Sequence, residues 1–377
     1  MVFAPPPVQS TSTPARRLDS ITSHLSASTM ADKLKVVVCR DLGPDVMPLL
    51  LNNPQLDVIL WPHNKACERK WLLQNARGAS GILVMLSEKV DDELLDTAGP
   101  KLRVVSTMSV GYEHADLKAL LTRGVRFGYT PDVLTDAVAD LSVMLALMAG
   151  RNAKETTEVV QSGQWPNFVW SPFAFCGPQL SPIGSSAPKR TAGFIGFGRI
   201  AHATLARLVP FGFQRCLYTG NAKTPPNPAA DAALAAQFRV QEVRRVELAE
   251  LARESDVVFV LAPGGPATHH IVDEDFLRQM KKTAVLVNTS RGTLVDSDAL
   301  AKALREGWLY GAGIDVVEGE PNVGLDHPLV KAPRCIVLPH VGSATNETRM
   351  GMATMTANNL LAGLFGQEMP AELATSR

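Results

Sequence analysis

The sequence predicts an α/β protein of two domains, each with a doubly wound parallel sheet. The chain has 377 residues, which is enough for two domains that each bury a substantial core. From Lys33 onward, short apolar runs alternate with longer stretches of helical periodicity. Hydrophobicity within the short runs is continuous rather than alternating, which is typical of parallel strands buried on both faces.

The first group of apolar runs lies before residue 130, and the stretches between the runs are long enough for crossover helices. The strands predicted there cover residues 35–40, 57–61, 81–86, 102–107 and 125–129. A helix is predicted next, over Thr135–Gly150, because its apolar residues fall on one stripe. The Thr135 side chain can cap the start of this helix, and Gly150 can end it.

Residues 164–190 interrupt this alternation. The segment is first aromatic and then rich in proline, serine and glycine, so we expect a long irregular excursion. An aromatic loop of this size usually packs on another surface, such as a second subunit. Its aromatic residues are Trp165, Phe168, Trp170, Phe173 and Phe175.

A second group of apolar runs follows the excursion and predicts a second parallel sheet. Its strands are expected over residues 191–195, 216–219, 256–262, 284–288, 312–316 and 335–338. Two groups of parallel strands imply two α/β domains.

Composition and charge narrow the classes of function. The 37 basic residues balance the 37 acidic ones, which gives no reason to expect nucleic acid or an anionic membrane as a partner. No apolar stretch approaches the roughly 20 residues of a membrane-spanning helix. The cysteines are scattered and form no Cys-x-x-Cys pair, so neither a disulfide framework nor a metal site is expected. Cys39, Cys176 and Cys335 lie in or beside apolar runs and are predicted to be buried.

Residues 1–32 differ in kind from the rest of the chain. They are rich in serine, threonine and proline, and Arg16 and Arg17 add positive charge. Either a disordered extension or a mitochondrial targeting segment fits this composition, although three early prolines disfavour an amphipathic helix. We expect a cytoplasmic location, with a mitochondrial one as the alternative.

A glycine-rich turn follows the first strand of the second group and opens a helix. Gly196 permits a tight turn, and Gly198 lets the backbone approach a pyrophosphate at the helix N-terminus. The small Ala201 lets the helix pack on the strand. Because strand, helix and next strand follow in order, the turn predicts a Rossmann-type dinucleotide site that includes Arg199 and Ile200.

The cofactor preference depends on the end of the next strand, where Asn221 lies. A site for NAD usually has an acidic side chain about 20 residues past the glycines, where it holds the ribose hydroxyls. That carboxylate is missing here, and Lys223 can supply positive charge to a 2′-phosphate. NADP is therefore the preferred cofactor, with NAD as the alternative because Asn221 is neutral and Lys223 can equally face solvent.

Three charged residues follow later strands, at the edge where open α/β sheets bind ligands. Arg291, Glu320 and His340 come after the fourth, fifth and sixth strands of the second group, respectively. Taken alone, each has an ordinary structural explanation, such as a surface cation for Arg291. Glu318 is a rival for Glu320 because it lies only two residues away.

Taken together, the motifs resemble those of the D-isomer-specific 2-hydroxyacid dehydrogenases from about residue 33 to residue 373. They come in the family's order, which is far more specific than any one motif alone. Within the family, the likeness is greatest to the branch that reduces glyoxylate and hydroxypyruvate. The motifs are GFGRIA, NTSRG, the Glu-Pro after GIDV, and PHVGSAT.

The resemblance implies a role for each site residue. His340 is the implied acid/base, Glu320 its carboxylate partner, and Arg291 the clamp for the carboxylate and carbonyl of the substrate. The backbone at Val110 and Gly111 is implied to bind the substrate carboxylate as well. Besides the glycine turn and Asn221, the implied cofactor contacts are Pro263, Thr289, Asp315 and Gly342.

These residue types suit hydride transfer to a 2-oxo acid. The transfer leaves alkoxide character on the carbonyl oxygen, which a protonated imidazole can neutralise while a carboxylate orients the ring. A guanidinium holds a planar carboxylate through two hydrogen bonds and so sets the face that receives the hydride. The implied product is the D-2-hydroxy acid.

The resemblance also implies the domain organisation. A flavodoxin-like substrate domain would combine residues 33–132 and 343–377, and a Rossmann-type nucleotide domain would cover residues 133–342. A homodimer is implied too.

Two other functions stay open on the same fold. One is an NAD-dependent dehydrogenase of the phosphoglycerate or D-lactate branch. The other is a nucleotide-sensing scaffold like the family's transcriptional co-repressors, which the three charged residues do not exclude because those relatives retain them. Four further histidines lie in helix or loop contexts without a partner motif, and we expect them to face solvent: His202, His269, His270 and His327.

Overall fold

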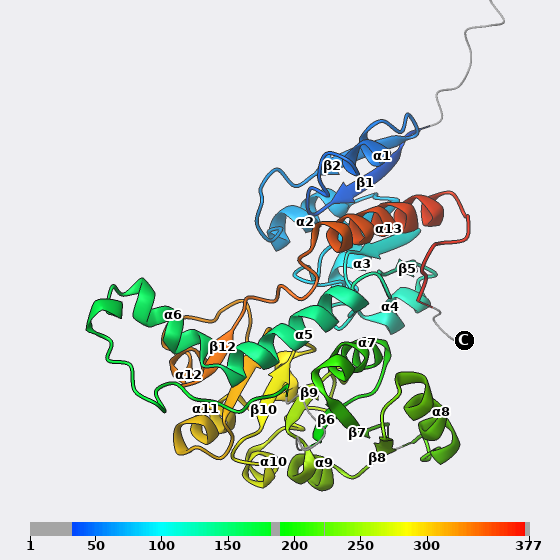
Figure 1. Cartoon of the computed structure of the whole chain (residues 1–377). Coiled ribbons are helices and arrows are strands. Elements are labelled where there is room, and N and C mark those ends of the chain that lie inside the picture. The colour runs from blue at the N-terminus through cyan, green and yellow to red at the C-terminus, as the bar shows by residue number, and fades with distance from the viewer. Residues whose placement is uncertain (1–31, 182–188, 222, 374–377) are drawn as a thin grey trace, which may run out of the picture.

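Five parallel strands form the first sheet, in the order β2-β1-β3-β4-β5 (Figure 1). The computed structural model describes residues 32–181, 189–221 and 223–373, so nearly all of the extension expected over residues 1–32 lies outside the described residues. Each strand overlaps a predicted run, and the order is that of flavodoxin-like sheets. The strands are β1 (Leu34–Val38), β2 (Leu56–Leu60), β3 (Gly81–Val84), β4 (Val104–Thr107) and β5 (Arg126–Gly128).

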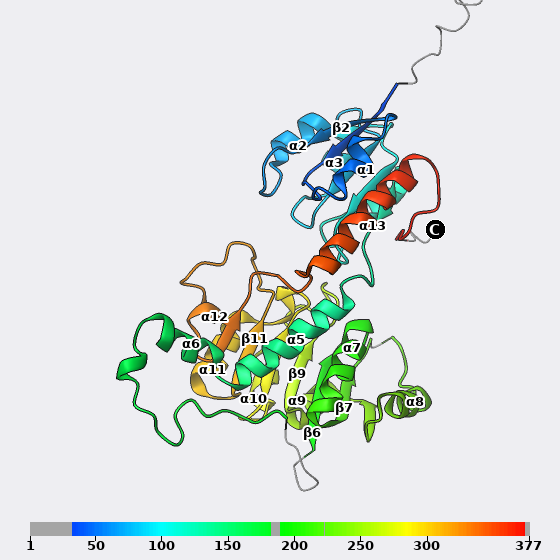
Figure 2. The same cartoon turned by 45° about the horizontal axis from the view of Figure 1, so that its top comes forward.

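Helices from both ends of the chain cover the first sheet. The last helix, α13 (Asn346–Leu364), packs against β3 and β4, and its Ala353, Ala357 and Leu360 belong to the hydrophobic core there. Figure 2 shows this sheet and its helices as one lobe, with α13 running toward the junction between the two lobes. The other helices of this first lobe are α1 (Met47–Leu51), α2 (Arg69–Ala76), α3 (Asp92–Ala98) and α4 (Leu117–Thr122).

Seven parallel strands form the second sheet, in the order β12-β11-β10-β9-β6-β7-β8. The order from β8 to β11 is the Rossmann order, and β12 extends it by one strand. The two sheets confirm the predicted fold class. The strands are β6 (Arg190–Ile195), β7 (Phe213–Thr219), β8 (Glu242–Arg245), β9 (Val257–Val260), β10 (Val285–Asn288), β11 (Gly311–Ile314) and β12 (Cys335–Val337).

Strand β8 was not predicted, because it has no apolar run. Its sequence is Glu-Val-Arg-Arg, and only Val243 is buried. It lies at the edge of the sheet and pairs with β7 alone. An edge strand with charged side chains is also less prone to pair with other chains.

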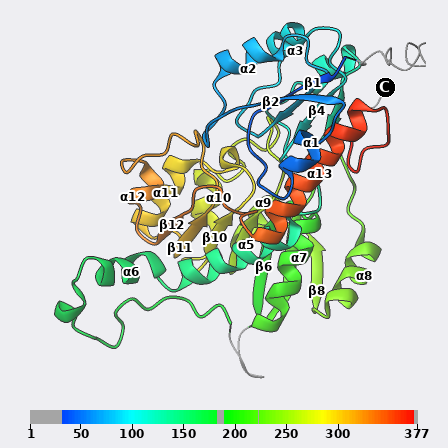
Figure 3. The ribbon, with the colours of Figure 1, turned by 90° about the horizontal axis from the view of Figure 1, so that it is seen from above.

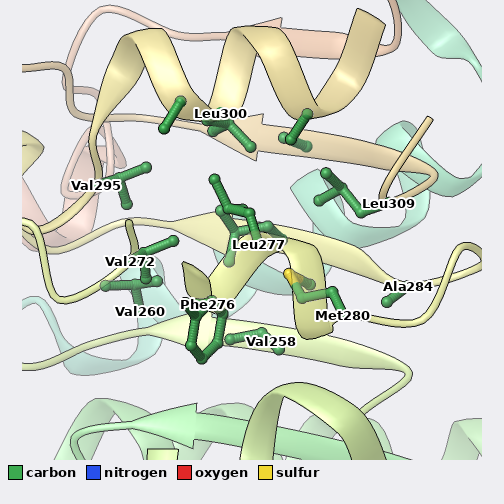
Figure 4. Packing of buried hydrophobic residues seen from close by; sticks show 14 of the residues in the cluster. Val258, Val260, Val272, Phe276, Leu277, Met280, Ala284, Val295, Leu300 and Leu309 are labelled. Atoms are coloured by element: carbon green, nitrogen blue, oxygen red, sulfur yellow. The ribbon is translucent and has the colours of Figure 1, made fainter. Parts of the chain in front are cut away.

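Helices cover both faces of the second sheet, and Figure 4 shows one of the two cores that result. In it, Phe276 and Leu277 pack against Val258 and Val260. The helices of this second lobe are α5 (Thr135–Gly150), α6 (Ala153–Gln161), α7 (Arg199–Leu208), α8 (Pro228–Phe238), α9 (Leu248–Glu254), α10 (Glu274–Gln279), α11 (Ser297–Glu306) and α12 (Pro328–Lys331), with 3-10 turns η1 (Trp165–Asn167), η2 (Val209–Phe211) and η3 (Gly292–Leu294).

The predicted helix over Thr135–Gly150 is confirmed as α5, which packs on α7, β10 and β11. The prediction of a Thr135 cap is wrong, because the helix begins at Thr135 after Leu134 and no side chain caps its first N–H groups. Among the described residues, no helix is both long and apolar enough to span a membrane.

The aromatic excursion leaves the second lobe together with α6 (Figure 3). From Gln164 to Ser181 its only regular element is η1, as expected for an irregular segment. Trp170 and Phe173 are 77% and 86% exposed. Cys39 and Cys335 are buried as predicted, but the prediction for Cys176 is wrong, because its apolar run lies on this exposed excursion instead of in a strand.

Candidate active site

The carboxyl ends of the two sheets face each other across the junction of the lobes. The loops after β4, β10, β11 and β12 carry the predicted substrate and catalytic residues, and the loop after β6 carries the glycine turn. An ion pair between the loop after β4 and the loop after β10 joins the two sides. Open α/β sheets bind ligands at such edges.

His340 and Glu320 form a direct pair. Nδ1 of His340 lies 2.7 Å from Oε1 of Glu320, and the other carboxylate oxygen accepts a hydrogen bond of 3.1 Å from the Val317 N–H. His340 has a left-handed backbone (φ 56°), and its N–H donates to the Asp315 carbonyl at 2.8 Å. Since Nδ1 faces the carboxylate, Nε2 is the nitrogen left for a substrate.

The charges around Glu320 favour its ionised form. Burial raises the pKa of the Glu320 carboxyl, but the hydrogen bond and positive charge of His340 and the Val317 N–H outweigh this effect. The positive charge of Arg291 acts in the same direction, and the pKa lies below its ordinary value. An ionised Glu320 can hold an imidazolium at His340 in place.

Arg291 lies in a loop that is fixed by Asn288 at the end of β10. The Asn288 side chain donates to the Arg291 carbonyl at 2.9 Å and accepts from the Ser290 N–H at 3.1 Å. The guanidinium donates to both carboxylate oxygens of Glu113, from Nε at 3.1 Å and from Nη2 at 3.3 Å. Glu113 was not predicted from the sequence, and it shows that this guanidinium presents a two-pronged face to a carboxylate.

Gly111 permits this approach of Arg291. A Cβ at Gly111 would lie 1.6 Å from Nη2 of Arg291, so a side chain there would displace the guanidinium. Hydrogen bonds within the loop after β4 hold Gly111 in place. The Ser109 hydroxyl donates to the Gly111 carbonyl at 2.7 Å and lies 2.9 Å from the Thr107 hydroxyl. The structure therefore brings together Arg291 and the half-buried Val110–Gly111 segment from opposite sheets.

The glycine turn has the geometry of a phosphate site. Gly196 has φ 88°, and a Cβ there would lie 2.7 Å from the backbone of Ala262, at the start of the loop after β9. A Cβ on Gly198 would meet nothing within 4 Å, so space is open there. Helix α7 begins next with no side-chain cap, and Ala201 is fully buried. Open space before an uncapped helix N-terminus fits a pyrophosphate.

The family model for the "D-isomer specific 2-hydroxyacid dehydrogenase, NAD binding domain" matches residues 143–342. The chain belongs to this dehydrogenase family. It is therefore an oxidoreductase that uses a nicotinamide cofactor to interconvert 2-oxo and 2-hydroxy acids.

Relatives within the family match nearly the whole chain. The chain is 42% identical over 340 residues to the glyoxylate reductase/hydroxypyruvate reductase of Homo sapiens, which covers 90% of this chain and 98% of the relative. It is 38% identical over 311 residues to the glyoxylate reductase of Thermofilum pendens, which covers 82% of this chain and 85% of the relative.

Solved structures with the same fold match nearly the whole chain as well. A protein from Thermus thermophilus has a TM-score of 0.78 at 36% identity and covers 90% of this chain and 100% of its own. The NADPH-dependent glyoxylate/hydroxypyruvate reductase of Sinorhizobium meliloti, in complex with NADP and malonate, has a TM-score of 0.69 at 29% identity. That match covers 91% of this chain and 97% of the other.

The remaining expected cofactor residues of this dehydrogenase line the ends of β9 to β12. Asp315 is buried and accepts hydrogen bonds of 2.8 Å from the N–H groups of Val341 and Gly342, so it holds the loop that carries His340. Burial raises the pKa of the Asp315 carboxyl above its ordinary value against these hydrogen bonds. The Thr289 hydroxyl lies 2.8 Å from that of Ser142 on α5, and Pro263 is exposed after β9.

Arg245, a residue not predicted from the sequence, lies beside Asn221, which is the residue expected near the 2′ end of the nucleotide. It ends β8, and its Nη2 donates to the Asn221 carbonyl at 2.9 Å while Nη1 donates to the Thr224 carbonyl. The Asn221 side chain accepts from the Lys223 N–H at 2.9 Å, so it holds its own loop. Arg245 was missed because the strand that carries it was missed.

The other histidines meet the expectation that they face solvent only in part. His269 is exposed as expected, whereas His202, His270 and His327 are half-buried. His270 Nε2 lies 2.8 Å from Glu318 and His269 Nε2 lies 3.5 Å from it, so Glu318 is not the residue that contacts His340. His202 is half-buried, with its ring against Phe197 and Phe238, and His327 accepts the Leu329 N–H at the start of α12. The residues next to each histidine in the sequence gave no sign of these contacts.

Proposed function

We propose that the chain reduces glyoxylate or hydroxypyruvate to the D-2-hydroxy acid with NADPH. The observation that carries this proposal is the convergence of two units at one edge. One is the His340–Glu320 pair at 2.7 Å, and the other is the Arg291 guanidinium against Gly111. The names of the relatives, glyoxylate and hydroxypyruvate reductases, support the choice of substrate.

In this proposal Arg291 binds the carboxylate and carbonyl of the substrate in place of Glu113. The N–H groups of Val110 and Gly111 bind the same carboxylate. NADPH, when bound, supplies the hydride for the carbonyl carbon. His340, as imidazolium, gives a proton from Nε2 to the carbonyl oxygen as the carbon–oxygen double bond becomes single. The ionised Glu320 stabilises the imidazolium before the transfer, and solvent restores the proton afterwards.

NADPH is proposed over NADH because two cations, Arg245 and Lys223, lie at the loop after β7. Asn221 stands where a carboxylate would hold the ribose hydroxyls of NAD. The guanidinium of Arg245 lies against this loop and Lys223 belongs to it, so two cations can face a 2′-phosphate. The remaining proposed cofactor contacts are Gly196, Gly198, Arg199, Ile200, Pro263, Thr289, Asp315 and Gly342.

A homodimer and a cytoplasmic location complete the proposal. Exposed aromatic side chains gather on the excursion, and a partner subunit would cover them. Light scattering of the wild-type chain and of a variant with Trp170→Ser and Phe173→Ser tests the dimer, which the double variant should weaken. Localisation of a tagged full-length chain decides between the cytoplasm and mitochondria.

One assay tests the reaction. Purified protein is mixed with NADPH or NADH and with glyoxylate, hydroxypyruvate, pyruvate or phosphohydroxypyruvate, and oxidation of the nucleotide is followed by absorbance. We expect the highest kcat/KM with NADPH and one of the first two acids. A preference for NADH with pyruvate or phosphohydroxypyruvate would move the chain to the D-lactate or phosphoglycerate branch. Oxidation with none of them would contradict the proposed reaction and favour a nucleotide-sensing scaffold.

A further inference from the structure

A cluster of three metal-binding side chains lies outside the proposed catalytic set. His269, His270 and Glu318 each offer a ligand atom, and these atoms all lie within 4.8 Å of one another. The two histidines come from the loop after β9, and Glu318 comes from the loop after β11. Their side chains are between 34% and 52% exposed, so an ion from solvent can reach them.

The backbone at His270 brings the two rings to the same side. Side chains of consecutive residues in extended backbone point in opposite directions. Here His270 has a left-handed backbone (φ 48°), and its N–H donates to the Thr293 carbonyl at 2.8 Å. As a result the rings of His269 and His270 stack with centroids 3.9 Å apart, and both Nε2 atoms face Glu318.

The distances suit one tetrahedral ion. Ligand atoms about 2.1 Å from a zinc ion at tetrahedral angles are roughly 3.4 Å from one another. Nε2 of His269 is 3.5 Å from one oxygen of Glu318, and Nε2 of His270 is 2.8 Å from the other. Small rotations of these exposed side chains would bring both nitrogens and one oxygen onto an ion, with water as the fourth ligand.

Asp296 lies near the second ring nitrogen of His270, where histidine ligands usually have an outer contact, but it is beyond hydrogen-bond distance. A carboxylate commonly faces the second nitrogen of a metal-bound imidazole and fixes the ring. Oδ2 of Asp296 lies 4.0 Å from Nδ1 of His270, while its Oδ1 caps α11 by accepting from the N–H groups of Asp298 and Ala299. Asp296 is thus anchored on the side of the ring opposite Glu318.

We propose that His269, His270 and Glu318 bind one divalent transition-metal ion of the zinc class. The ion would join the loop after β9 to the loop after β11. The loop after β11 also carries Glu320. Gly292, next to Arg291, packs closely on this loop, so that a Cβ on Gly292 would lie 2.3 Å from the backbone nitrogen of Glu318. The bound ion therefore stabilises the segment that presents Glu320, whichever 2-oxo acid is the substrate.

Zinc titration of the tag-free, full-length chain tests this proposal. After treatment with EDTA and its removal, Zn²⁺ binding is measured by calorimetry and by competition with a chromogenic chelator. The variants are His269→Ala and Glu318→Gln, with His63→Ala as the control for an exposed histidine and His340→Ala as the control for the catalytic pair. Circular dichroism shows whether each variant is folded.

We expect one Zn²⁺ per chain in the wild type and in both controls. Binding should weaken at least about tenfold in His269→Ala and in Glu318→Gln. Co²⁺ at the same site should give the visible absorption of a tetrahedral ion with nitrogen and oxygen ligands, and this absorption should disappear in His269→Ala. Equal binding in all four variants, loss in His340→Ala alone, or no saturable binding in the wild type would overturn the proposal.

Discussion

Two histidine–glutamate pairs use carboxylates two residues apart on the loop after β11. Glu320 is 2.7 Å from His340, and Glu318 is 2.8 Å from His270. The contacts are nearly equal in length, but the rings are used differently. His340 turns Nδ1 to its carboxylate and, in the proposed reaction, uses Nε2 on the substrate, whereas His270 turns Nε2 to Glu318. The two hydrogen-bond distances do not distinguish the pairs. We therefore infer a catalytic role for the His340–Glu320 pair from its place between the two sheets and not from the length of its contact.

Replacement of His340 should give the largest effect. His340→Ala removes the proposed proton donor, and general acid catalysis contributes roughly 10²–10⁴-fold to a rate. We expect kcat to fall by that range. The affinity for NADPH, measured by quenching of protein fluorescence, should stay within about twofold because the glycine turn is untouched.

The matched variant for this prediction is His270→Ala, which breaks the other pair. It should lower kcat by no more than about 2.5-fold, which on a logarithmic scale is a tenth of the largest loss expected for His340→Ala. Equal losses in the two variants would show that the two pairs do not differ in the way proposed.

The two glutamates give the next largest contrast. Glu320→Gln removes the charge that stabilises the imidazolium, so we expect kcat to fall roughly 10–100-fold while KM for NADPH is unchanged. The fall in kcat caused by Glu318→Gln should be at least about tenfold smaller than the fall caused by Glu320→Gln. Steady-state kinetics on both variants provide the test, and Glu320→Asp should recover part of the loss if position and charge both matter. A larger loss in Glu318→Gln would exchange the roles of the two residues.

Arg245 sharpens the comparison at the far end of the cofactor. Arg245→Ala removes a cation beside the loop after β7, so KM for NADPH should rise by about tenfold, whereas KM for NADH should change little. Arg253→Ala, an exposed cation of the same lobe on α9, is the control. A parallel rise for both nucleotides would mean that Arg245 only supports the loop.

The sequence predicted what depends on local pattern and missed what depends on contacts between distant segments. Short, mainly apolar runs predicted eleven of the described strands, because parallel strands are buried on both faces. Strand β8 lacks such a run and was missed, and Arg245 with it. The ends of strands predicted Arg291 and His340, but Glu113 lies 178 residues from Arg291 in the chain, and no local signal indicates that contact. The contacts of His269 and His270 with Glu318 were missed for the same reason, since Glu318 comes from another loop.

The smallest effect should be on stability at low pH. The pKa of Glu320 lies below its ordinary value of 4.5, and that of Glu318 is lowered too, by its hydrogen bond with His270. A carboxylate with a lowered pKa stabilises the fold above its unfolded pKa, and this contribution is lost as the pH falls through the folded pKa. At pH 7 the Tm of the wild type should therefore exceed that of Glu320→Gln by about a few degrees at most. This difference in Tm should vanish well below pH 4.5.

Glu318→Gln supplies the comparison for this pH effect. Its difference from the wild type should have the same sign but be smaller, because Glu318 is more exposed than Glu320 and water screens its pair. The measurement is thermal unfolding by circular dichroism from pH 7 to pH 3, without added metal. If the wild type and Glu320→Gln differed by the same amount at every pH, ionisation of Glu320 would not contribute to stability, and the proposed charge pairing with His340 would be wrong.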